Sequence, residues 1–392
     1  LEYPAWNVNG ISQEPGVDRA VQAKCLPSYL QEAGYRTIHV GKAHFGAVGT
    51  PGADPLNLGF DLNIAGHAAG GPGSYLSEQG FSAQWRDGDE VWDVPGLEKY
   101  HDSGVFLTEA LTREANEAMQ AAVDDSQPFF LYMSHYAVHV PFAEDPRFIG
   151  KYRDEGLPPQ EAMYAALIEG MDKSLGDILD RLEQLGVDDN TVVLFMSDNG
   201  GLSAHGRDGE PHTHNQPLSS GKGSVHEGGI REPMLVRWPG VTTADSVCHD
   251  YLIIEDFFPS LLEIAGVQDG YTSDGHSFVP LLHGGDTDPD RPLFWHYPNN
   301  WGPAGPGIGS YSAIRQGDWK LIYYHEPDRT QRYELFNIAT DIGETNNRVA
   351  TEPEIVARLS NRLRLFLLEV EAQMPTDRAT GHTVPLPGDA ST

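Results

Sequence analysis

Cysteine is almost absent from this chain of 392 residues, which contains only Cys25 and Cys248. Two cysteines exclude a disulfide framework beyond a single bridge, and they do not identify the redox compartment. The sequence has no run of 18 apolar residues, so it predicts no membrane span. The chain begins at Leu1 rather than Met, in a polar, loop-like stretch, so the lack of a visible signal peptide says little about targeting.

Positive charge is also scarce. Basic residues number 26 against 57 acidic residues, so the formal net charge is −31. This balance argues against nucleic acid as a general partner, because its phosphate backbone would be repelled. An anionic substrate would need a local cluster of Lys, Arg and His that acts against the overall charge. Because Lys is rare here, each Lys in a predicted loop is a stronger candidate for a functional residue than usual.

The first two-thirds of the chain alternates helical and strand patterns. Helical patterns cover residues 27–34, 107–123, 161–185 and 256–265, and strand patterns cover 36–40, 128–133, 191–196 and 233–237. The alternation predicts an α/β fold with a mostly parallel central sheet flanked by helices. Further on, antiparallel strands are predicted at 312–324 and 332–336, and a helix at 352–372. We therefore predict an α/β domain over residues 1–285 and a small C-terminal subdomain of antiparallel sheet plus helix, with a loose tail, over 286–392.

The most informative string is Ser197-Asp-Asn-Gly-Gly201, which follows the predicted strand 191–196. In open α/β sheets, ligands bind at the carboxyl ends of strands. Asp198 and Asn199 offer hard oxygen ligands, which calcium and magnesium prefer. The alternative is an Asx turn that closes the strand, and the string alone does not decide between them.

Lysine and histidine follow two other predicted strands. Lys42 and His44 follow the strand 36–40, and such a pair can hold an anion and move a proton. His135 and His139 follow the strand 128–133, and Pro141 stiffens the loop that carries His139. For each string alone, a surface lysine and structural histidines remain the alternative.

A third string, residues 221–233, contains four glycines and places Lys222 between two of them. The glycines allow a close backbone approach, and a lysine among them suits a bound anion. The spacing is not that of a Walker loop. His212 and His214 lie upstream, but no third nitrogen or thiolate ligand follows at a familiar zinc spacing.

Together these strings resemble the type I sulfatases of the alkaline-phosphatase-like superfamily. The matching strings occur in the family's order: Leu26-Pro27…Ala33-Gly34-Tyr35-Arg36-Thr37…Gly41-Lys42-Ala43-His44, His139-Val140-Pro141, Ser197-Asp198-Asn199-Gly200, and Gly221-Lys222-Gly223…Glu227-Gly228-Gly229-Ile230-Arg231…Pro233. Residues 319–322 and 333–344 are similar to the family's last subdomain. The resemblance covers nearly the whole chain, and five strings in order are far more specific than any one of them.

The resemblance implies a sulfuric ester hydrolase with Lys42, His44, His139 and Lys222 as catalytic residues. Asp198 and Asn199 would be ligands of a calcium ion, with magnesium as the alternative, that holds the sulfate oxygens. The two lysines would hold the sulfate charge. His44 would take a proton when the covalent sulfate ester is released, and His139 would help to protonate the leaving alcohol. This assignment agrees with the chemistry, since a dianionic transition state needs preorganised cations.

The resemblance is incomplete at the N-terminus. The family's nucleophile is a formylglycine made in a Cys/Ser-x-Pro-Ser/Ala-Arg motif, which is expected upstream of Leu1, as are the paired Asp of the family's first strand. The 392 residues alone are therefore expected to be inactive. Cys25-Leu-Pro-Ser-Tyr29 imitates the motif, but Tyr29 replaces the arginine, and Cys25 is interpreted as an ordinary buried or helix-start thiol. The family resemblance also predicts a secreted or periplasmic protein.

The predicted substrate is a sulfated carbohydrate or an aryl sulfate. The segment 294–301 contains Trp295 and Trp301, which can stack on sugar rings, although a packing loop is an equal alternative. The candidate substrate-binding residues are His214, His226, His296 and Arg315. Two other functions stay open, namely a phosphonate or phosphodiester hydrolase of the same superfamily and a non-catalytic relative that binds sulfated glycans.

Overall fold

The computed structural model describes residues 1–4, 23–202, 215–267, 270–286, 288–300 and 305–389. These residues form two compact units. The first unit comprises the described residues within 5–191 and 254–279, and the second comprises those within 1–4, 192–253 and 280–392. Residues 192–253, which the sequence places with the α/β domain, are thus grouped with the C-terminal part of the chain.

The first unit is built on a parallel sheet with the strand order β2-β1-β3. The central strand, β1 (Arg36–Gly41), pairs with β2 (Leu62–Ile64) and β3 (Phe129–Ser134). β1 is buried from its second residue to its last, which agrees with its central place. Because the three strands run in one direction, their carboxyl ends lie at the same edge of the sheet.

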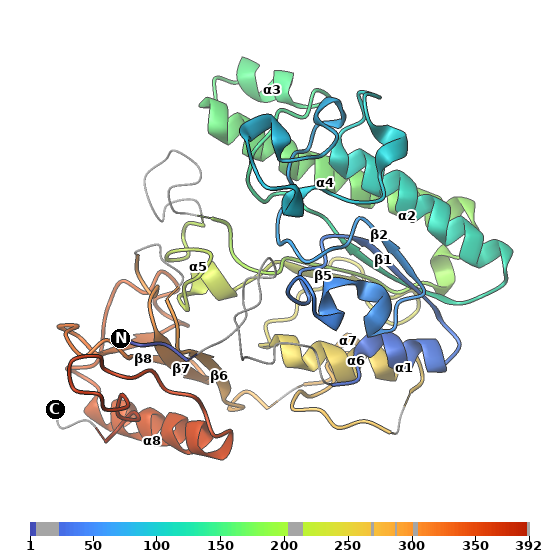
Figure 1. Cartoon of the computed structure of the whole chain (residues 1–392). Helices are drawn as coiled ribbons and strands as arrows, with labels where there is room; N and C mark the ends of the chain where they lie inside the picture. The colour runs from blue at the N-terminus through green and yellow to red at the C-terminus, as the bar shows by residue number, and fades with distance from the viewer. Residues whose placement is uncertain (5–22, 203–214, 268–269, 287, 301–304, 390–392) are drawn as a thin grey trace. The chain divides into compact units, whose positions relative to one another are not determined.

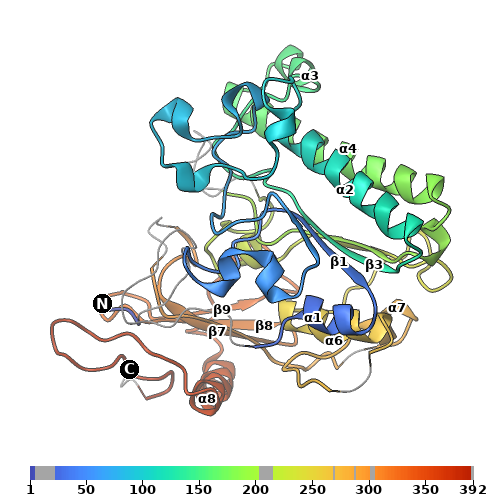
Figure 2. The ribbon, with the colours of Figure 1, turned by 45° about the vertical axis from the view of Figure 1, so that its right-hand side comes forward.

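Helices cover both faces of this sheet. Figure 1 and Figure 2 show α2 (Leu107–Asp124) and α4 (Pro159–Gln184) side by side on one face, and α1 (Leu26–Glu32) with α6 (Phe257–Ile264) on the other. The short helix α3 (Ile149–Asp154) packs on α4. Cys25 is the residue just before α1, so its interpretation as a helix-start thiol is confirmed. None of the helices in the described part of the chain is long and apolar enough to cross a membrane.

The core of the first unit includes residues of the sheet and of α2. Ile38 and Val40 of β1 belong to the same apolar cluster as Leu107 and Leu111 of α2, and all four side chains are fully buried. These contacts fix β1, and with it the turn that follows β1.

Leu111→Ala is expected to lower the free energy of unfolding by about 2–5 kcal/mol, because it removes buried methyl groups and leaves a cavity. Denaturant titration measures this loss. Ile168→Ala on α4 is the matched control, because Ile168 is 44% exposed; its expected effect is about 0.5 kcal/mol or less. Equal losses in the two variants would contradict the assigned core.

The second unit contains two antiparallel sheets. β4 (Val193–Met196) pairs with β5 (Met234–Arg237), and the other sheet has the order β6-β7-β8-β9. Its strands are Leu293–Tyr297, Tyr311–Gln316, Trp319–Tyr324 and Tyr333–Asn337. The helices are α5 (Glu227–Ile230), α8 (Pro353–Glu369) and α7 (Val279–Leu282), which begins at the boundary between the units.

The four-stranded sheet is covered on both faces. Leu321 and Tyr323 of β8 share an apolar cluster with Leu363 of α8. The alternate residues Ile322 and Tyr324 pack in another cluster with Val225, which precedes α5. Because side chains alternate between faces, Lys320 lies on the same face as Ile322 and Tyr324.

The predicted fold class is confirmed, including the parallel sheet flanked by helices and the C-terminal antiparallel sheet with its helix. The predicted helices and strands are all present, with bounds shifted by a few residues. Two features were not predicted. β4 and β5 pair antiparallel, a direction that apolar runs do not encode, and residues 293–297 form the strand β6 rather than a loop.

Candidate active site

Lys42 lies in the turn after β1. Its amide donates a hydrogen bond of 2.7 Å to the carbonyl oxygen of Ser134 at the end of β3. Gly41 has a φ of +105°, and a Cβ atom there would lie 1.9 Å from that oxygen, so glycine is required. The turn is therefore held against the neighbouring strand at the edge where ligands bind in such sheets.

His139 lies in the loop after β3. The hydroxyl of Tyr75, which is fully buried, lies 2.8 Å from the carbonyl oxygens of Tyr136 and His139 and so holds this loop. His139 Nδ1 lies 2.7 Å from the carbonyl oxygen of Val140. An acceptor at this distance requires a proton on Nδ1, so the neutral ring carries its lone pair on Nε2 and the charged ring carries a donor there.

Gly70 and Gly71 bring the two candidate histidines together. A Cβ atom on Gly70 would lie 2.5 Å from His44 Nδ1, and one on Gly71 would lie 2.7 Å from His139 Nδ1. The amide of His44 also donates to the carbonyl oxygen of His67 (3.0 Å) in the same segment. Sequence reasoning missed these glycines, although the glycine-rich run from Gly70 to Gly73 was a signal for close backbone approach.

His39 on β1 is fully buried beneath the Lys42 turn. Its Nε2 lies 3.3 Å from the Lys42 carbonyl oxygen, and its Nδ1 lies 3.1 Å from Asn63 Oδ1. Burial lowers the pKa of His39 to about 4, against a small opposing effect of these two contacts. The ring is therefore neutral at physiological pH and acts as a support for the turn rather than as a charge.

The free energy of unfolding is expected to fall by about 2 kcal/mol between pH 7.5 and pH 5 because of His39 alone. The pKa of His39 is about 4 in the folded protein, against its ordinary value of 6.5, so the unfolded chain binds more protons in this window. Stability therefore rises with pH from 4 to 6.5. Denaturant titrations at several pH values should show a smaller loss on acidification for His39→Gln. The same pH dependence in both proteins would contradict this role for His39.

Asp198 and Asn199 follow β4 in the second unit and lie against the segment that carries Lys222. The amide of Gly200 donates to the carbonyl oxygen of Gly229 (3.2 Å), and the amide of Lys222 donates to that of Gly201 (3.3 Å). A Cβ atom on Gly200 would lie 1.8 Å from the carbonyl oxygen of Gly228, which explains the glycine after Asn199.

Asn215, which sequence reasoning did not single out, ties these two segments together. Its side chain accepts from the amide of Gly201 (3.1 Å) and donates to the carbonyl oxygens of Gly201 and Ser220 (2.9 Å each). The structure therefore brings the Asp198–Asn199 turn and the Lys222 segment together within the second unit. No sequence signal distinguished Asn215 from an ordinary loop residue.

Glu232 is a second acidic group beside Asp198. Its Oε1 is buried and has no hydrogen-bond partner among the described residues. Burial, and then the negative charge of Asp198, raise the pKa of Glu232 to about 8. Burial and the nearby Asp198 thus disfavour ionisation of Glu232, and a divalent cation bound here would favour it.

The described residues fit part of a calcium site. Asn199 Nδ2 donates to the carbonyl oxygen of Gly200 (3.0 Å), which leaves Oδ1 as the amide atom suited to a cation. Calcium takes six to eight oxygen ligands. Within the described parts of the chain, no three His, Cys, Asp or Glu side chains surround a common metal position. Asp198 and Asn199 therefore supply suitable donors without completing a shell.

The four candidate substrate-binding residues differ from this group. His226 is buried, with Nδ1 3.0 Å from Ser219 Oγ and Nε2 3.2 Å from Glu334 Oε2. His296 bonds to Ser312 and Gln373, and burial lowers its pKa. Arg315 is 4% exposed and lies over the ring of Tyr251. The contacts of these three side chains are with the protein itself, which favours a structural role. His214 and Trp301 lie outside the described residues.

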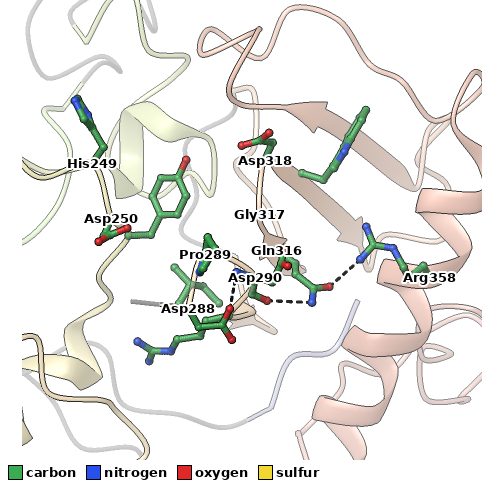
Figure 3. A pocket seen from close by; sticks show the side chains of 13 residues that line it. His249, Asp250, Asp288, Pro289, Asp290, Gln316, Gly317, Asp318 and Arg358 are labelled. Carbon is green, nitrogen blue, oxygen red and sulfur yellow. Dashed lines mark hydrogen bonds between the residues drawn. The ribbon is translucent and has the colours of Figure 1, made fainter. Parts of the chain in front are cut away.

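A cavity of about 480 Å³ lies elsewhere in the second unit (Figure 3). Its lining includes the carboxylates of Asp250, Asp288, Asp290 and Asp318 and the guanidinium groups of Arg291 and Arg358. Arg358 donates to Gln316, which donates to the carbonyl oxygen of Asp290. None of the predicted site residues lines this cavity. Its excess of carboxylates does not suit a sulfate ester.

Comparisons with known proteins identify the family. A family model described as "Sulfatase" matches residues 3–267, and one described as "N-sulphoglucosamine sulphohydrolase, C-terminal" matches residues 221–373. The N-acetylgalactosamine-6-sulfatase of Canis lupus familiaris is 32% identical over 84% of this chain and 67% of that protein. Arylsulfatase J of Mus musculus is 28% identical over 87% of this chain and 61% of that protein. The chain thus spans 61–67% of the length of these two relatives.

A solved structure shows the same fold. The crystal structure of Ps i-CgsB in complex with k-i-k-neocarrahexaose has a TM-score of 0.78 and 26% sequence identity, and the match covers 95% of this chain and 80% of that one. The family model matches more than half of the residues, in the region that carries Lys42, His44, His139, Asp198, Asn199 and Lys222. This chain belongs to the sulfatase family.

Proposed function

We propose that the protein hydrolyses sulfate esters of a carbohydrate. Two observations in a chain of this family carry the proposal. The first unit holds Lys42, His44 and His139 in turns after parallel strands, and the second unit holds Asp198 and Asn199 against the segment of Lys222. The strongly acidic chain keeps lysines at two of these turns, where sequence reasoning expected an anion. The names of the relatives support the substrate class, since one is an N-acetylgalactosamine-6-sulfatase and another was solved in complex with k-i-k-neocarrahexaose.

Lys42 and Lys222 would bind the negative charge of the sulfate group. Both are held through backbone amides, at Ser134 and Gly201, so their turns are in place before substrate arrives. Preorganised charge of this kind stabilises a transition state more than flexible charge does, because little reorganisation is needed during the reaction.

His139 would donate a proton to the leaving alcohol from Nε2. The carbonyl oxygen of Val140, 2.7 Å from Nδ1, stabilises the charged ring that this role requires. His44, held next to the same glycine pair, would accept the proton when sulfate is released.

Asp198 and Asn199 would hold calcium or magnesium, whose positive charge would help to bind the sulfate oxygens. No stretch of the 392 residues matches the complete nucleophile motif of the family. The roles proposed above therefore do not involve a formylglycine. We also propose a secreted or periplasmic location, which rests on the family resemblance and is testable by cell fractionation.

The protein is purified from its natural source, and its intact mass is compared with the 43.0 kDa of these 392 residues. The test is then a parallel assay of this protein on several esters. Substrates are the sulfate monoester, the phosphate monoester and the phosphodiester of one phenol, and a sulfated oligosaccharide. Release of sulfate from the oligosaccharide with little phosphate release supports the proposal. Faster phosphoester cleavage would assign the protein to the phosphoesterases. Oligosaccharide binding without sulfate release would indicate a glycan-binding relative.

A further inference from the structure

A buried cluster of charged side chains lies between β8 and the segment that carries Lys222. It is called the Lys320 cluster here and consists of Lys320, Glu227, Glu344, Arg315 and His226. Lys320 and the Glu344 side chain are 0% exposed, and the other side chains are 2–5% exposed. All five residues belong to the second unit.

Lys320 is fully partnered on the Val225 face of β8. Its Nζ donates to the carbonyl oxygen of Val225 (3.0 Å) and to Glu227 Oε1 (2.8 Å), and it lies 2.6 Å from Glu344 Oε1. The ammonium group thus makes two hydrogen bonds and one ion pair by distance, since Glu344 Oε1 lacks hydrogen-bond geometry. Val225 and Glu227 flank His226 and follow Lys222 by three and five residues. Lys320 therefore ties the segment that carries Lys222 to the four-stranded sheet.

Glu227 is held at several atoms. Its amide donates to Glu344 Oε2 (2.6 Å), and its Oε2 accepts from Arg231 Nε (2.6 Å) and Arg315 Nη1 (3.4 Å). Despite its burial, the charges of Lys320 and the two arginines lower the pKa of Glu227 to about 2. It is therefore a permanent carboxylate that orients both ends of α5.

His226 extends the cluster in the other direction. It contacts Ser219 Oγ through Nδ1 and Glu334 Oε2 through Nε2, while the amide of Gly228 donates to the Ser219 carbonyl oxygen (2.9 Å). Hydrogen bonds therefore hold the segment from Ser219 to Arg231 internally, and the contact with Glu334 holds it against β9.

The candidate site depends on this segment. The amide of Gly200, next to Asn199, donates to the Gly229 carbonyl oxygen, and Lys222 is part of the segment itself. A displacement of the segment would therefore move both the proposed cation ligand and the proposed sulfate-binding lysine. The contact path from Lys320 to Gly200 runs through residues 225–229 without a gap.

Stability alone does not explain a lysine at this position. The following residues of β8, Leu321 to Tyr324, are buried and apolar or aromatic. Replacing buried ion pairs by well-packed apolar side chains is often neutral or stabilising, whereas buried charges have directional requirements that select one arrangement. Here the Lys320 ammonium group needs acceptors in fixed directions, and the Val225–Glu227 segment provides them only in one position.

We propose that Lys320 is a positioning residue, which holds the Ser219–Arg231 segment so that Lys222 and Asn199 meet the sulfate group in one geometry. The proposal rests on the proposed function for its catalytic consequence, and on the contacts above for the anchoring. Lys320 itself does not touch substrate.

The test compares Lys320→Met with Tyr323→Phe, a variant of the same strand that loses the hydrogen bond from Tyr323 to the Pro385 carbonyl oxygen on the opposite face. Sulfate release and amide hydrogen exchange are measured below the unfolding transition of each protein.

Lys320→Met is expected to lower kcat by about 10- to 100-fold, because misplacement by about 1 Å costs this much. Its KM for a small sulfate ester is expected to change by less than about threefold. Exchange is expected to accelerate within residues 219–231. Tyr323→Phe should leave these quantities unchanged.

Glu344→Gln is the second variant, because Lys320→Met removes the lysine beside the buried Glu344 carboxylate and can prevent folding. The amide oxygen of Gln can still accept from the Glu227 amide, so the fold is retained while one partner charge of Lys320 is lost. It should give the same pattern with a smaller fall in kcat. Unchanged kcat and unchanged exchange in this segment would overturn the proposal. If the wild-type protein releases no sulfate, the proposed function fails, whereas the exchange data still support or overturn the anchoring.

Discussion

Lys222→Ala is expected to lower kcat for sulfate ester hydrolysis by about 10²–10³-fold, which corresponds to about 2.7–4 kcal/mol of transition-state stabilisation. The variant removes one of two lysines that would bind sulfate charge in a chain with a net charge of −31. Its backbone amide still bonds to Gly201, so the segment should keep its place. Steady-state kinetics on a sulfated oligosaccharide measure the effect, and the release of phosphate from the matched phosphate ester shows whether it extends to other anions.

Lys173→Ala is the matched control for Lys222. Lys173 lies on α4 with 54% of its side chain exposed, paired with Asp177, and an exposed pair of this type contributes about 0.3–0.5 kcal/mol to stability. Its kcat should equal that of the wild type. If Lys222→Ala also retains kcat within about threefold, Lys222 does not bind the transferring group.

Gly200→Ala is expected to reduce the free energy of unfolding by about 3 kcal/mol or more and to abolish sulfate release. The added Cβ atom would lie 1.8 Å from the carbonyl oxygen of Gly228 and 2.9 Å from the Cα atom of Gly229. Both obstacles are backbone, so the two segments must separate. Separation breaks the hydrogen bond from Gly200 to Gly229 and moves Asn199 away from the Lys222 segment.

Gly176→Ala in α4 controls for the substitution itself. A Cβ atom at Gly176 meets nothing within 4 Å, and alanine is favoured over glycine in a helix interior by about 1 kcal/mol. The control should therefore be slightly more stable than the wild type and fully active. Denaturant titration and the sulfate assay compare the two variants. A Gly200→Ala protein as stable and as active as Gly176→Ala would show that the close contact of Gly200 is not required.

The sequence and the structure agree best where local pattern decides. The apolar runs and helical periodicity predicted the strands that end at Gly41, Ser134 and Met196, and the structure has them. Since polar residues directly after a strand must leave the sheet at its edge, the turns of Lys42, His139 and Asp198 were also predictable. The same logic could not separate a ligand from a support, because both kinds of residue follow strands.

Histidine and arginine show this limit most clearly. His226 and Arg315 are polar residues in or near matching strings, and sequence reasoning took them for substrate-binding groups. In the structure, His226 bonds to Ser219 and Glu334, and Arg315 reaches Glu227. In two of these contacts the partner lies more than 80 residues away, and in the third Ser219 lies seven residues from His226 within a loop. No local pattern encodes such pairings.

The sequence by itself determined the family, the α/β class, the strand ends that carry Lys42, His139 and Asp198, and the glycine-rich string that carries Lys222. These features depend on local periodicity and on short strings, which can be recognised without knowing which residues are neighbours in space. Only the tertiary structure decided the antiparallel pairing of β4 with β5, the approach of Gly70 and Gly71 to two imidazole rings, and the burial of Lys320 between two glutamates. Each of these depends on groups that are distant in the chain and that packing and the need to satisfy buried charge bring together.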